Sequence, residues 1–358
     1  KLMKFPVKFH LSINDVDINF ERNIVYKFND PVDGEVYQPF TIVPVATCSI
    51  KEKVIIFSDQ KTKKIPVHIR AGKDNIEGII TLNSPEDWVI KPQSHPFSVE
   101  KKGDQSIVYF EVSPPKEISE GQLNPIIQIE EKTYDKELHV LDYKYIPLQQ
   151  VLMKSESKVV HLILQKKGEN IGYIEGAGDA VPESLEQIGY QVTRIKPAEI
   201  TYDKLVKFDA IVMGIRAYNT VPELEFKQVE LNRYIENGGN LILQYNTSHR
   251  LITKDIAPFQ IELSRDRVTD EFSEGSFLAP EHPILNYPNK ISVNDFENWV
   301  QERGLYFPNK WAKEFTPLLG MNDKKNKLTK GALLVAPYGK GYYIYTGISF
   351  FRELPAGV

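Results

Sequence analysis

The sequence predicts a β-sandwich followed by an α/β domain, whose mostly parallel sheet is covered by helices on both faces. Before about residue 150, apolar residues come in short runs with a period of two, whereas later apolar runs alternate with helical segments. A chain of 358 residues is also too long for one ordinary core. We therefore expect at least two domains.

The first half has the pattern of strands. The runs KVIIFS, IPVHIRA, EGIITL, SIVYFEVS and KELHVLDY are bounded by Pro, Gly, Asn or Asp, and none has the spacing of a helix. The turn-rich stretch DPVDGEVYQPF, residues 30–40, indicates a junction. We expect residues 1–29 to be the terminal strands of a preceding sandwich and residues 30–150 to form an immunoglobulin-like sandwich.

The second half, residues 155–358, alternates between strands and helices. Strands are predicted at VVHLIL, IGYIEG, YQVTRIK, DAIVMGI, NLILQYN, ALLVAP and YYIYTGI. VPESLEQIGY predicts a helix with Asp179 as its cap and Pro182 in its first turn, and TYDKLVKF predicts a short one. VPELEFKQVELNRYIENGG predicts a longer helix that places Leu224, Leu231 and Ile235 on one side and ends at two glycines.

Charge and composition exclude several function classes. With 44 basic and 48 acidic residues the net charge is −4, so the chain lacks the basic footprint of a nucleic-acid-binding protein. No apolar run approaches the roughly 20 residues that span a bilayer, so we expect no membrane insertion. The single cysteine, Cys48, cannot form an internal disulfide or a zinc knuckle.

Cofactor and metal motifs are incomplete. None of the seven histidines has a second histidine at the i, i+4 spacing of a helical zinc pair, so no metal site is predicted. The stretch GAGD, Gly176 to Asp179, follows a strand as phosphate loops do, but Val181 stands where a third glycine would be needed. A tight turn explains it as well, and we expect no cofactor.

Candidate ligand-binding residues lie at the predicted strand ends, because ligands of parallel sheets bind outside the carboxyl ends of the strands. Arginine offers a planar fork to carboxylates or vicinal hydroxyls, asparagine donates and accepts, and tyrosine adds a flat face. These groups suit a sugar or a small carboxylate. The alternative is that Arg216 pairs with an acid such as Glu302 and that Tyr218 packs against a helix. The strand-end candidates are Arg216, Tyr218, Asn219, Tyr245, Asn246, His249 and Arg250.

A second dense stretch is FENWVQERGLYF, residues 296–307. Its Phe296, Trp299, Val300 and Tyr306 could form a ligand platform, but aromatic residues at such spacing favour packing in a core. Glu302 and Arg303 are candidate ligand-binding residues, or they form a salt bridge near the pocket.

Several long segments together resemble a known family. They are IGYIEGAGDAVPESLEQIGY, DAIVMGIRAYNT, YIENGGNLILQYNT, HPILNYPNKISVNDFENWVQERGLYF and GKGYYIYTGISFFRELPAG. They resemble the carboxy-terminal region of large PIG-L (LmbE-like) deacetylases of Bacteroidetes type, and FERNIVYKFNDPVDGEVYQPF is similar to a sandwich junction in the same proteins. A more distant likeness links the α/β half to ThuA-like domains.

The resemblance implies an architecture and a context. In those proteins β-sandwich modules and a class I glutamine amidotransferase-like domain, which is flavodoxin-like, follow the deacetylase. It implies a parent protein that acts on N-acetylated sugars, a deacetylase domain of the same polypeptide as partner, and a periplasmic or extracellular location. The zinc-binding His-Pro-Asp-Asp type of motif occurs nowhere in this sequence.

The amidotransferase chemistry has no residues to perform it. An active domain needs Gly-x-Cys-x-Gly at a strand-to-helix elbow and a histidine held by a carboxylate. The strand end at Gln244 to Ser248 has neither thiol nor flanking glycines, and TGISFFRE supplies no histidine for Glu353 to orient. No catalytic residue is assigned.

A hydroxyl could replace the thiol. Thr247 or Ser248 with His249 as base are the remaining candidates, but adjacent residues on an extended chain point in opposite directions, so the turn would have to be sharp. Otherwise Asn246, Thr247 and Ser248 cap the next segment.

Two functional hypotheses follow. The first is a non-catalytic accessory region of a PIG-L-type N-acetyl-sugar deacetylase that binds a saccharide or the partner domain. The second is a hydrolase or transferase with an unfamiliar site around Arg216, Tyr218, Asn246, His249 and Glu302. A catalytic site should hold a base and a nucleophile within about 3 Å of each other.

Overall fold

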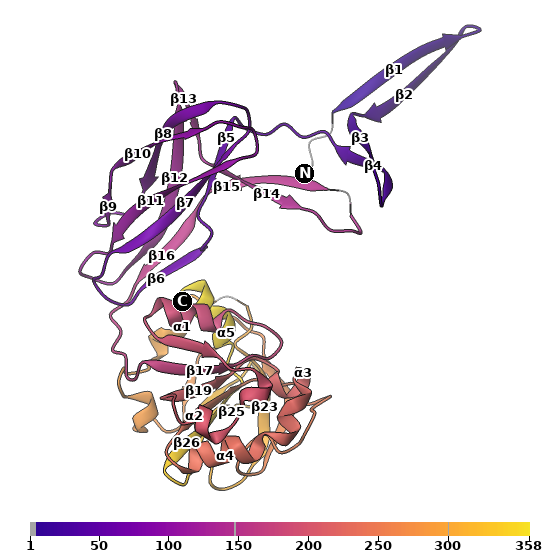
Figure 1. Ribbon diagram of the computed structural model, residues 1–358. Helices are drawn as coiled ribbons and strands as arrows, with labels where there is room; N and C mark the ends of the chain where they lie inside the picture. The colour runs from indigo at the N-terminus through magenta and orange to yellow at the C-terminus, as the bar shows by residue number, and fades with distance from the viewer. Residues whose placement is uncertain (1–4, 147, 300) are drawn as a thin grey trace. The chain divides into compact units, whose positions relative to one another are not determined.

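The computed structural model describes residues 5–146, 148–299 and 301–358. The chain folds into two compact units, one comprising Lys1–Ile55 and Gln60–Val159 and the other Ile56–Asp59 and Val160–Val358 (Figure 1). Among the described residues, no helix is both long and apolar enough to cross a bilayer.

The first unit begins with two separate hairpins. They pair β1 (Pro6–Ile13) with β2 (Val16–Asn23) and β3 (Val25–Asp30) with β4 (Gly34–Pro39). A two-stranded hairpin has no second layer against which to bury a face, and β1 and β2 are exposed along their whole length. That these strands belong to a preceding sandwich stays a prediction.

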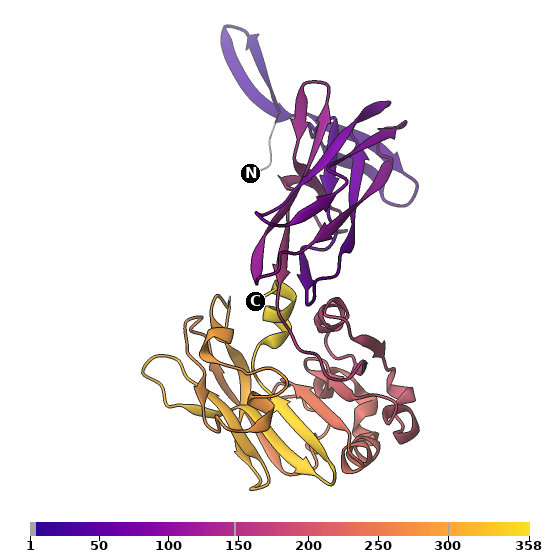
Figure 2. The same ribbon diagram turned by 90° about the vertical axis from the view of Figure 1, so that its left-hand side faces the viewer.

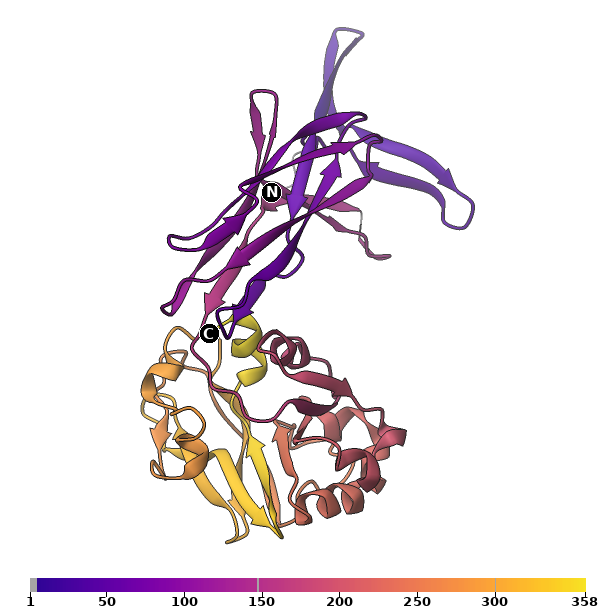
Figure 3. The same cartoon turned by 60° about the vertical axis from the view of Figure 1, so that its left-hand side comes forward.

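Two larger sheets form the body of the first unit (Figure 3). Their strand orders are β5-β7-β11-β9 and β10-β8-β12-β16-β6. In β7, Ile65, Val67 and Ile69 are buried and alternate with more exposed residues, as the period of two in the sequence requires. β13 (Lys132–Tyr134) pairs with β12, and β14 (Lys136–Leu141) forms a hairpin with β15 (Gln149–Lys154). The sheet strands are β5 (Ala46–Ser49), β6 (Val54–Phe57), β7 (Lys63–Ala71), β8 (Ile76–Asn83), β9 (Val89–Lys91), β10 (Ser94–Val99), β11 (Gln105–Ser113), β12 (Ser119–Ile129) and β16 (Ser157–His161).

The second unit contains an eight-stranded sheet of order β18-β17-β19-β20-β26-β25-β24-β22. From β18 to β26 the neighbours are parallel, and from β26 to β22 they are antiparallel. Its strands are β17 (Asn170–Ile174), β18 (Gln191–Arg194), β19 (Ala210–Met213), β20 (Asn240–Gln244), β22 (Ser276–Phe277), β24 (Thr316–Met321), β25 (Thr329–Tyr338) and β26 (Gly341–Thr346). A separate antiparallel pair joins β21 (Ile261–Val268) to β23 (Gly304–Trp311).

The predicted fold class is wrong for this unit. The structure is 46% strand and only 13% helix, with many small antiparallel sheets, and is not a mostly parallel flavodoxin-like or amidotransferase-like fold with helices on both faces. Its helices are short: α1 (Val181–Gln187), α2 (Tyr202–Leu205), α3 (Ala217–Thr220), α4 (Gln228–Glu236) and α5 (Phe350–Ala356). The predicted strand VVHLIL also joins a sheet of the first half as β16.

A tight hairpin explains the difference. Only Gly339 and Lys340 separate β25 from β26, so the chain turns back on itself with no crossover helix (Figure 2). Gly339 has φ +61° and its Cβ position lies 2.4 Å from a backbone oxygen of Glu236, so glycine is required there. From β26 onward the sheet is therefore antiparallel.

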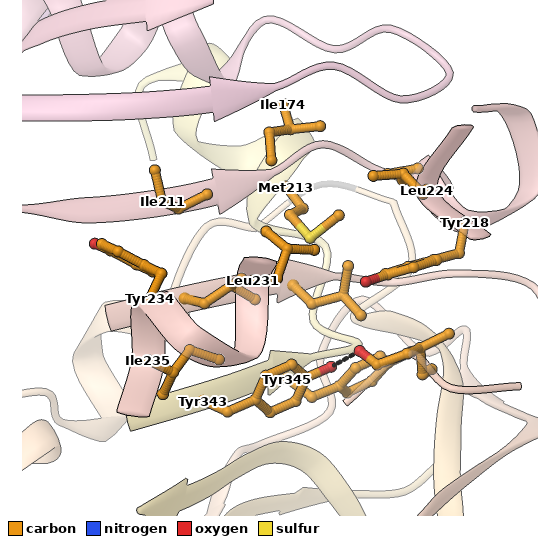
Figure 4. Packing of buried hydrophobic residues seen from close by; sticks show 14 of the residues in the cluster. Ile174, Ile211, Met213, Tyr218, Leu224, Leu231, Tyr234, Ile235, Tyr343 and Tyr345 are labelled. Atoms are coloured by element: carbon orange, nitrogen blue, oxygen red, sulfur yellow. Dashed lines mark hydrogen bonds between the residues drawn. The ribbon is translucent and has the colours of Figure 1, made fainter. Parts of the chain in front are cut away.

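A hydrophobic core supports the parallel strands (Figure 4). The predicted apolar side of the long helix is confirmed, since Leu224, Leu231 and Ile235 are all fully buried. The helix itself divides at Lys227 into a 3-10 turn, Pro222–Phe226, and α4. This core fixes the strands whose ends form the candidate site.

Candidate ligand-binding site at the strand ends

The carboxyl ends of β19, β20 and β26 meet at one edge of the sheet, because these strands are parallel neighbours. The loops that follow them are joined by backbone hydrogen bonds, and the Arg216 amide donates to the Tyr245 carbonyl at 2.8 Å. Residues that are distant in the sequence are thus held together.

The GAGD turn fixes the end of β17. The Asp179 carboxylate accepts from the Tyr173 hydroxyl at 2.6 Å and from the amides of Val181 and Ile215 at 3.1 and 3.2 Å. Burial, followed by the bond to Asp179, raises the pKa of Tyr173. The helix begins at Val181 with Ala180 as the N-cap residue, one position after the predicted cap. Asp179 occupies the amides that a bound phosphate would need, so the turn has a structural role.

Two predicted ligand-binding residues are internal. Tyr218 is 1% exposed, and its hydroxyl donates to the Gln228 side chain at 2.6 Å. Asn246 is fully buried, accepts from the Tyr218 amide and donates to the Gln244 carbonyl, each at 2.9 Å. The polar groups of both side chains are used within the fold. Tyr218 packs in the hydrophobic core, in agreement with the alternative prediction (Figure 4).

Asn219 holds the turn at the end of β20. Its side-chain amide donates to the carbonyls of Thr247 and His249, each at 3.2 Å, and its oxygen accepts from the Thr247 amide at 2.9 Å. The Thr247 hydroxyl donates to the His249 carbonyl at 2.8 Å. Within the described residues, no hydrogen bond joins the His249 imidazole to the hydroxyl of Thr247 or Ser248. The predicted elbow is a hydrogen-bonded turn without a base-to-nucleophile contact.

Aromatic side chains gather beside this turn. The Tyr245 ring lies 6.3 Å from the Tyr306 ring at an interplanar angle of 8°, and 5.2 Å from the Phe351 ring. The His249 ring is 6.0 Å from Tyr306. We call Tyr245, Tyr306, Phe351 and His249 the aromatic cluster. In the described part of the chain, the hydroxyls of Tyr245 and Tyr306 make no hydrogen bond; Tyr245 is 8% exposed, whereas Tyr306 is half-buried.

The backbone at Tyr306 is strained. Its φ of +52° lies in the left-handed region, which a non-glycine residue adopts at a cost of about 1–3 kcal/mol. Such conformations persist where the surrounding structure determines them, and here the Tyr345 hydroxyl donates to the Tyr306 carbonyl at 3.3 Å.

Charged groups flank the aromatic cluster. The Arg352 guanidinium forms an ion pair with Glu302 at 2.9 Å and lies 5.2 Å from the Phe351 ring centre. Arg216 does not pair with Glu302, and its Nε is buried with no hydrogen-bond partner among the described residues. Burial raises the pKa of Tyr245, and the nearby charges of Arg216 and Arg352 oppose that shift.

The remaining two candidates lie apart from this arrangement. Arg250 is exposed with φ +58°. Arg303 is 4% exposed, donates to the Phe296 carbonyl at 2.7 Å and lies 5.2 Å from the Trp299 ring centre. Burial lowers its pKa. Because Glu302 pairs with Arg352, the predicted salt bridge between Glu302 and Arg303 is wrong.

The predicted platform in residues 296–307 is divided. Phe296, Trp299 and Arg303 line a separate pocket of about 460 Å³, and Phe296 and Trp299 also belong to a hydrophobic core. Tyr306 belongs to the aromatic cluster, and Val300 lies outside the described residues. Sequence reasoning missed Phe351 and Arg352 as site residues. Their position in α5, shortly after the end of β26, was the available signal.

The site combines flat apolar surface with planar charged groups. The half-buried Tyr306 and Phe351 supply the ring surface, and the half-buried Arg216 and Arg352 supply guanidinium donors suited to hydroxyl or carboxylate oxygens. In the described ranges, no group of three or more His, Cys, Asp and Glu side chains is arranged to hold a metal ion.

Comparisons with known proteins add little to this geometry. No protein-family model matches the chain, and no curated protein is significantly similar to it. Among solved structures, a family 123 glycoside hydrolase from Clostridium perfringens is similar at a TM-score of 0.22 and 8% identity, over 57% of this chain and 38% of that one. WR4, an MSP family member from C. elegans, reaches a TM-score of 0.20 and 9% identity over 32% of this chain and 98% of its own. The chain thus spans 38% of the length of the glycoside hydrolase, and likeness at these scores carries no argument about fold or function.

Proposed function

We propose that this chain is a non-catalytic accessory region of a PIG-L-type N-acetyl-sugar deacetylase, and that its aromatic cluster binds a saccharide. The observation that supports saccharide binding is the pair of nearly parallel rings, Tyr245 and Tyr306, flanked by Arg216 and by the Arg352–Glu302 pair. The deacetylase context rests only on the resemblance of the quoted segments. The competing hypothesis is that the deacetylase domain of the same polypeptide docks on this surface.

A sugar matches these groups for physical reasons. A pyranose ring presents an apolar face of C–H bonds and an edge of hydroxyls, so a tyrosine ring covers the face while its hydroxyl meets the edge. The guanidinium of Arg216 has an unused donor, and a buried donor without a partner is costly until a ligand supplies an acceptor. A hydroxyl or uronate oxygen would supply it.

The same geometry supports a binding role over catalysis. The Thr247 hydroxyl is committed to a backbone carbonyl, and His249 contacts an aromatic ring. A base without a nucleophile in reach performs no acyl or glycosyl transfer.

The proposal is tested by thermal unfolding of the chain with glucosamine, N-acetylglucosamine, glucuronic acid or glutamine. A ligand at 100 times its dissociation constant stabilises the fold by about 2.7 kcal/mol. For a unit of this size that is a rise of about 5–10 °C in Tm. Arg216→Met and Arg352→Met should each abolish the rise. Lys254→Ala removes an exposed charge from the loop after β20 and is the matched control. This variant should keep the rise in Tm.

Two results would contradict the proposal. One is that no sugar raises Tm by more than about 1 °C at concentrations up to the solubility limit. The other is that a sugar stabilises the parent and the two arginine variants equally, which would place its site elsewhere.

A further inference from the structure

A groove on the antiparallel half of the second unit is independent of the strand ends. It has a volume of about 790 Å³, within the range of small-ligand sites. Its walls come from β21, β23, β25 and the loop between β24 and β25, and Figure 1 labels β23 and β25. Six of its lining residues are Arg265, Arg267, Asn309, Trp311, Lys327 and Lys330. We call it the cationic groove.

The charges in this groove are unbalanced. Arg265, Arg267, Lys327 and Lys330 are all exposed, and none forms an ion pair with another described residue. By contrast, the neighbouring Lys310 is paired with Glu262 at 3.1 Å. In a chain of net charge −4, this is a local concentration of free positive charge.

The groove contains two carboxylates, Asp266 and Asp323, and one of them is already used. Asp323 accepts from the amides of Thr269 and Asp270, each at 2.8 Å, and from the Thr269 hydroxyl at 3.1 Å. These donors are neutral and leave the charge of Asp323 in place, but four cationic side chains against two carboxylates still give the lining a formal charge of +2. The field in the groove is therefore positive.

A β-bulge presents the arginines. Leu263 pairs with Pro308 and Asp266 with Phe307, so two residues of β21 are inserted with no partner across the pair. The inserted Ser264 hydroxyl donates to the Phe307 carbonyl at 2.7 Å and accepts from the Asp266 amide at 2.8 Å. A regular strand would turn every second residue inward, whereas here residues 265–267 are all exposed.

The opposite wall is held by its own hydrogen bonds. The Asn326 amide donates to the Asp323 carbonyl at 3.0 Å, and the Asn322 side chain donates to the carbonyls of Asp323 and Asn326 at 3.0 and 3.2 Å. A wall that is ordered before binding loses less conformational entropy when a ligand arrives.

The half-buried Trp311 and the exposed Asn309 distinguish this groove from a simple anion site. An indole face covers the C–H face of a sugar ring, and an amide donates to and accepts from hydroxyls. Nucleic-acid binding requires a longer basic surface than one groove on an acidic chain. Carboxylate groups on sugar rings fit the combination best.

We propose that the cationic groove binds an anionic oligosaccharide whose rings carry carboxylates, as a short uronic acid oligomer does. The guanidinium groups of Arg265 and Arg267 take carboxylates as planar forks, Lys327 and Lys330 add point charges, and Trp311 covers one ring. This site shares no residue with the aromatic cluster.

The test is calorimetric titration of the chain with tetragalacturonic acid. We expect Arg265→Ala/Arg267→Ala to weaken binding at least tenfold, because both guanidinium groups are lost. Both residues are exposed, so the fold should tolerate the change. Lys313→Ala/Lys324→Ala removes the same charge from exposed residues outside the lining and should change the dissociation constant less than twofold. The Arg265→Ala/Arg267→Ala variant should keep the rise in Tm that a monosaccharide produces at the strand ends, so failure here is distinguishable from failure at that site.

Four results would overturn the proposal. The arginine variant could bind as tightly as the parent, or the lysine control could lose as much affinity, which indicates attraction by net charge alone. The neutral tetramer of N-acetylglucosamine could bind equally well. Finally, inorganic phosphate or a short oligonucleotide could displace tetragalacturonic acid at equal concentration, which would assign the groove to a different anion.

Discussion

Asn246→Ala tests whether the polar strand end of β20 is structural. Asn246 is fully buried, and its side chain satisfies two backbone groups, the Tyr218 amide and the Gln244 carbonyl, each at 2.9 Å. Leaving a buried polar group without a partner costs about 1–3 kcal/mol, so loss of both bonds should reduce the unfolding free energy by about 2–6 kcal/mol. This is a large fraction of the stability of one domain.

The assay is urea unfolding followed by tryptophan fluorescence, because Trp299 and Trp311 lie in the second unit. With a slope of about 2 kcal/mol per molar urea, the midpoint should fall by about 1–3 M. Asn309→Ala, which removes an exposed amide, is the control and should change stability by less than about 0.5 kcal/mol. A loss in Asn246→Ala no larger than in this control would refute the structural role, and Asn246 would again be a candidate for ligand contact.

Three further changes have defined outcomes. Gly176→Ala should destabilise the second unit, as seen by a lower Tm, because its Cβ would lie 2.1 Å from the Ile215 carbonyl oxygen; an unchanged Tm would contradict the described turn. Burial raises the pKa of Cys48 to about 12, so the folded thiol stays protonated at pH 8 and should react with Ellman's reagent far more slowly than in urea; equal rates would show an accessible thiol. Glu302→Gln should cost about 0.5–1 kcal/mol in urea unfolding, because its partner Arg352 is partly exposed; a loss above about 3 kcal/mol would mean a buried pair.

Local patterns in the sequence predicted parts of the fold well. The spacing of Leu224, Leu231 and Ile235 identified a buried face, because helical periodicity alone decides which side chains share a side. The strand positions of β17, β19 and β20 followed from short apolar runs. Periodicity does not give strand direction, and here the error arose. The two residues between β25 and β26, one of them glycine, indicated an antiparallel hairpin that the expectation of a parallel sheet overrode.

Other strands gave no clear sequence signal. β23 contains a proline, and Tyr306 within it has a left-handed backbone, so neither propensity nor alternation marks it as a strand. β21 carries the charged run SRDR, because a bulge turns three consecutive residues outward. Both strands depend on tertiary pairing.

The candidate site shows a similar limit. Residue types at the strand ends could be identified from position, but only the structure shows that the adjacent side chains of Tyr245 and Asn246 are both buried, in different surroundings. Asn246 and Tyr218 use their polar groups inside the fold, whereas Tyr245, which is also buried, contacts the half-buried rings of Tyr306 and Phe351. Arg352 was missed because its role depends on an ion pair to a residue 50 positions earlier, Glu302.

The most direct test of the central claim is a crystal structure of the chain soaked with the amino sugar or uronic acid that raises Tm most. We predict a sugar ring lying against the aromatic cluster, with an oxygen within hydrogen-bond distance of the Arg216 guanidinium. A sugar bound elsewhere on the second unit, with the aromatic cluster unoccupied, would contradict it.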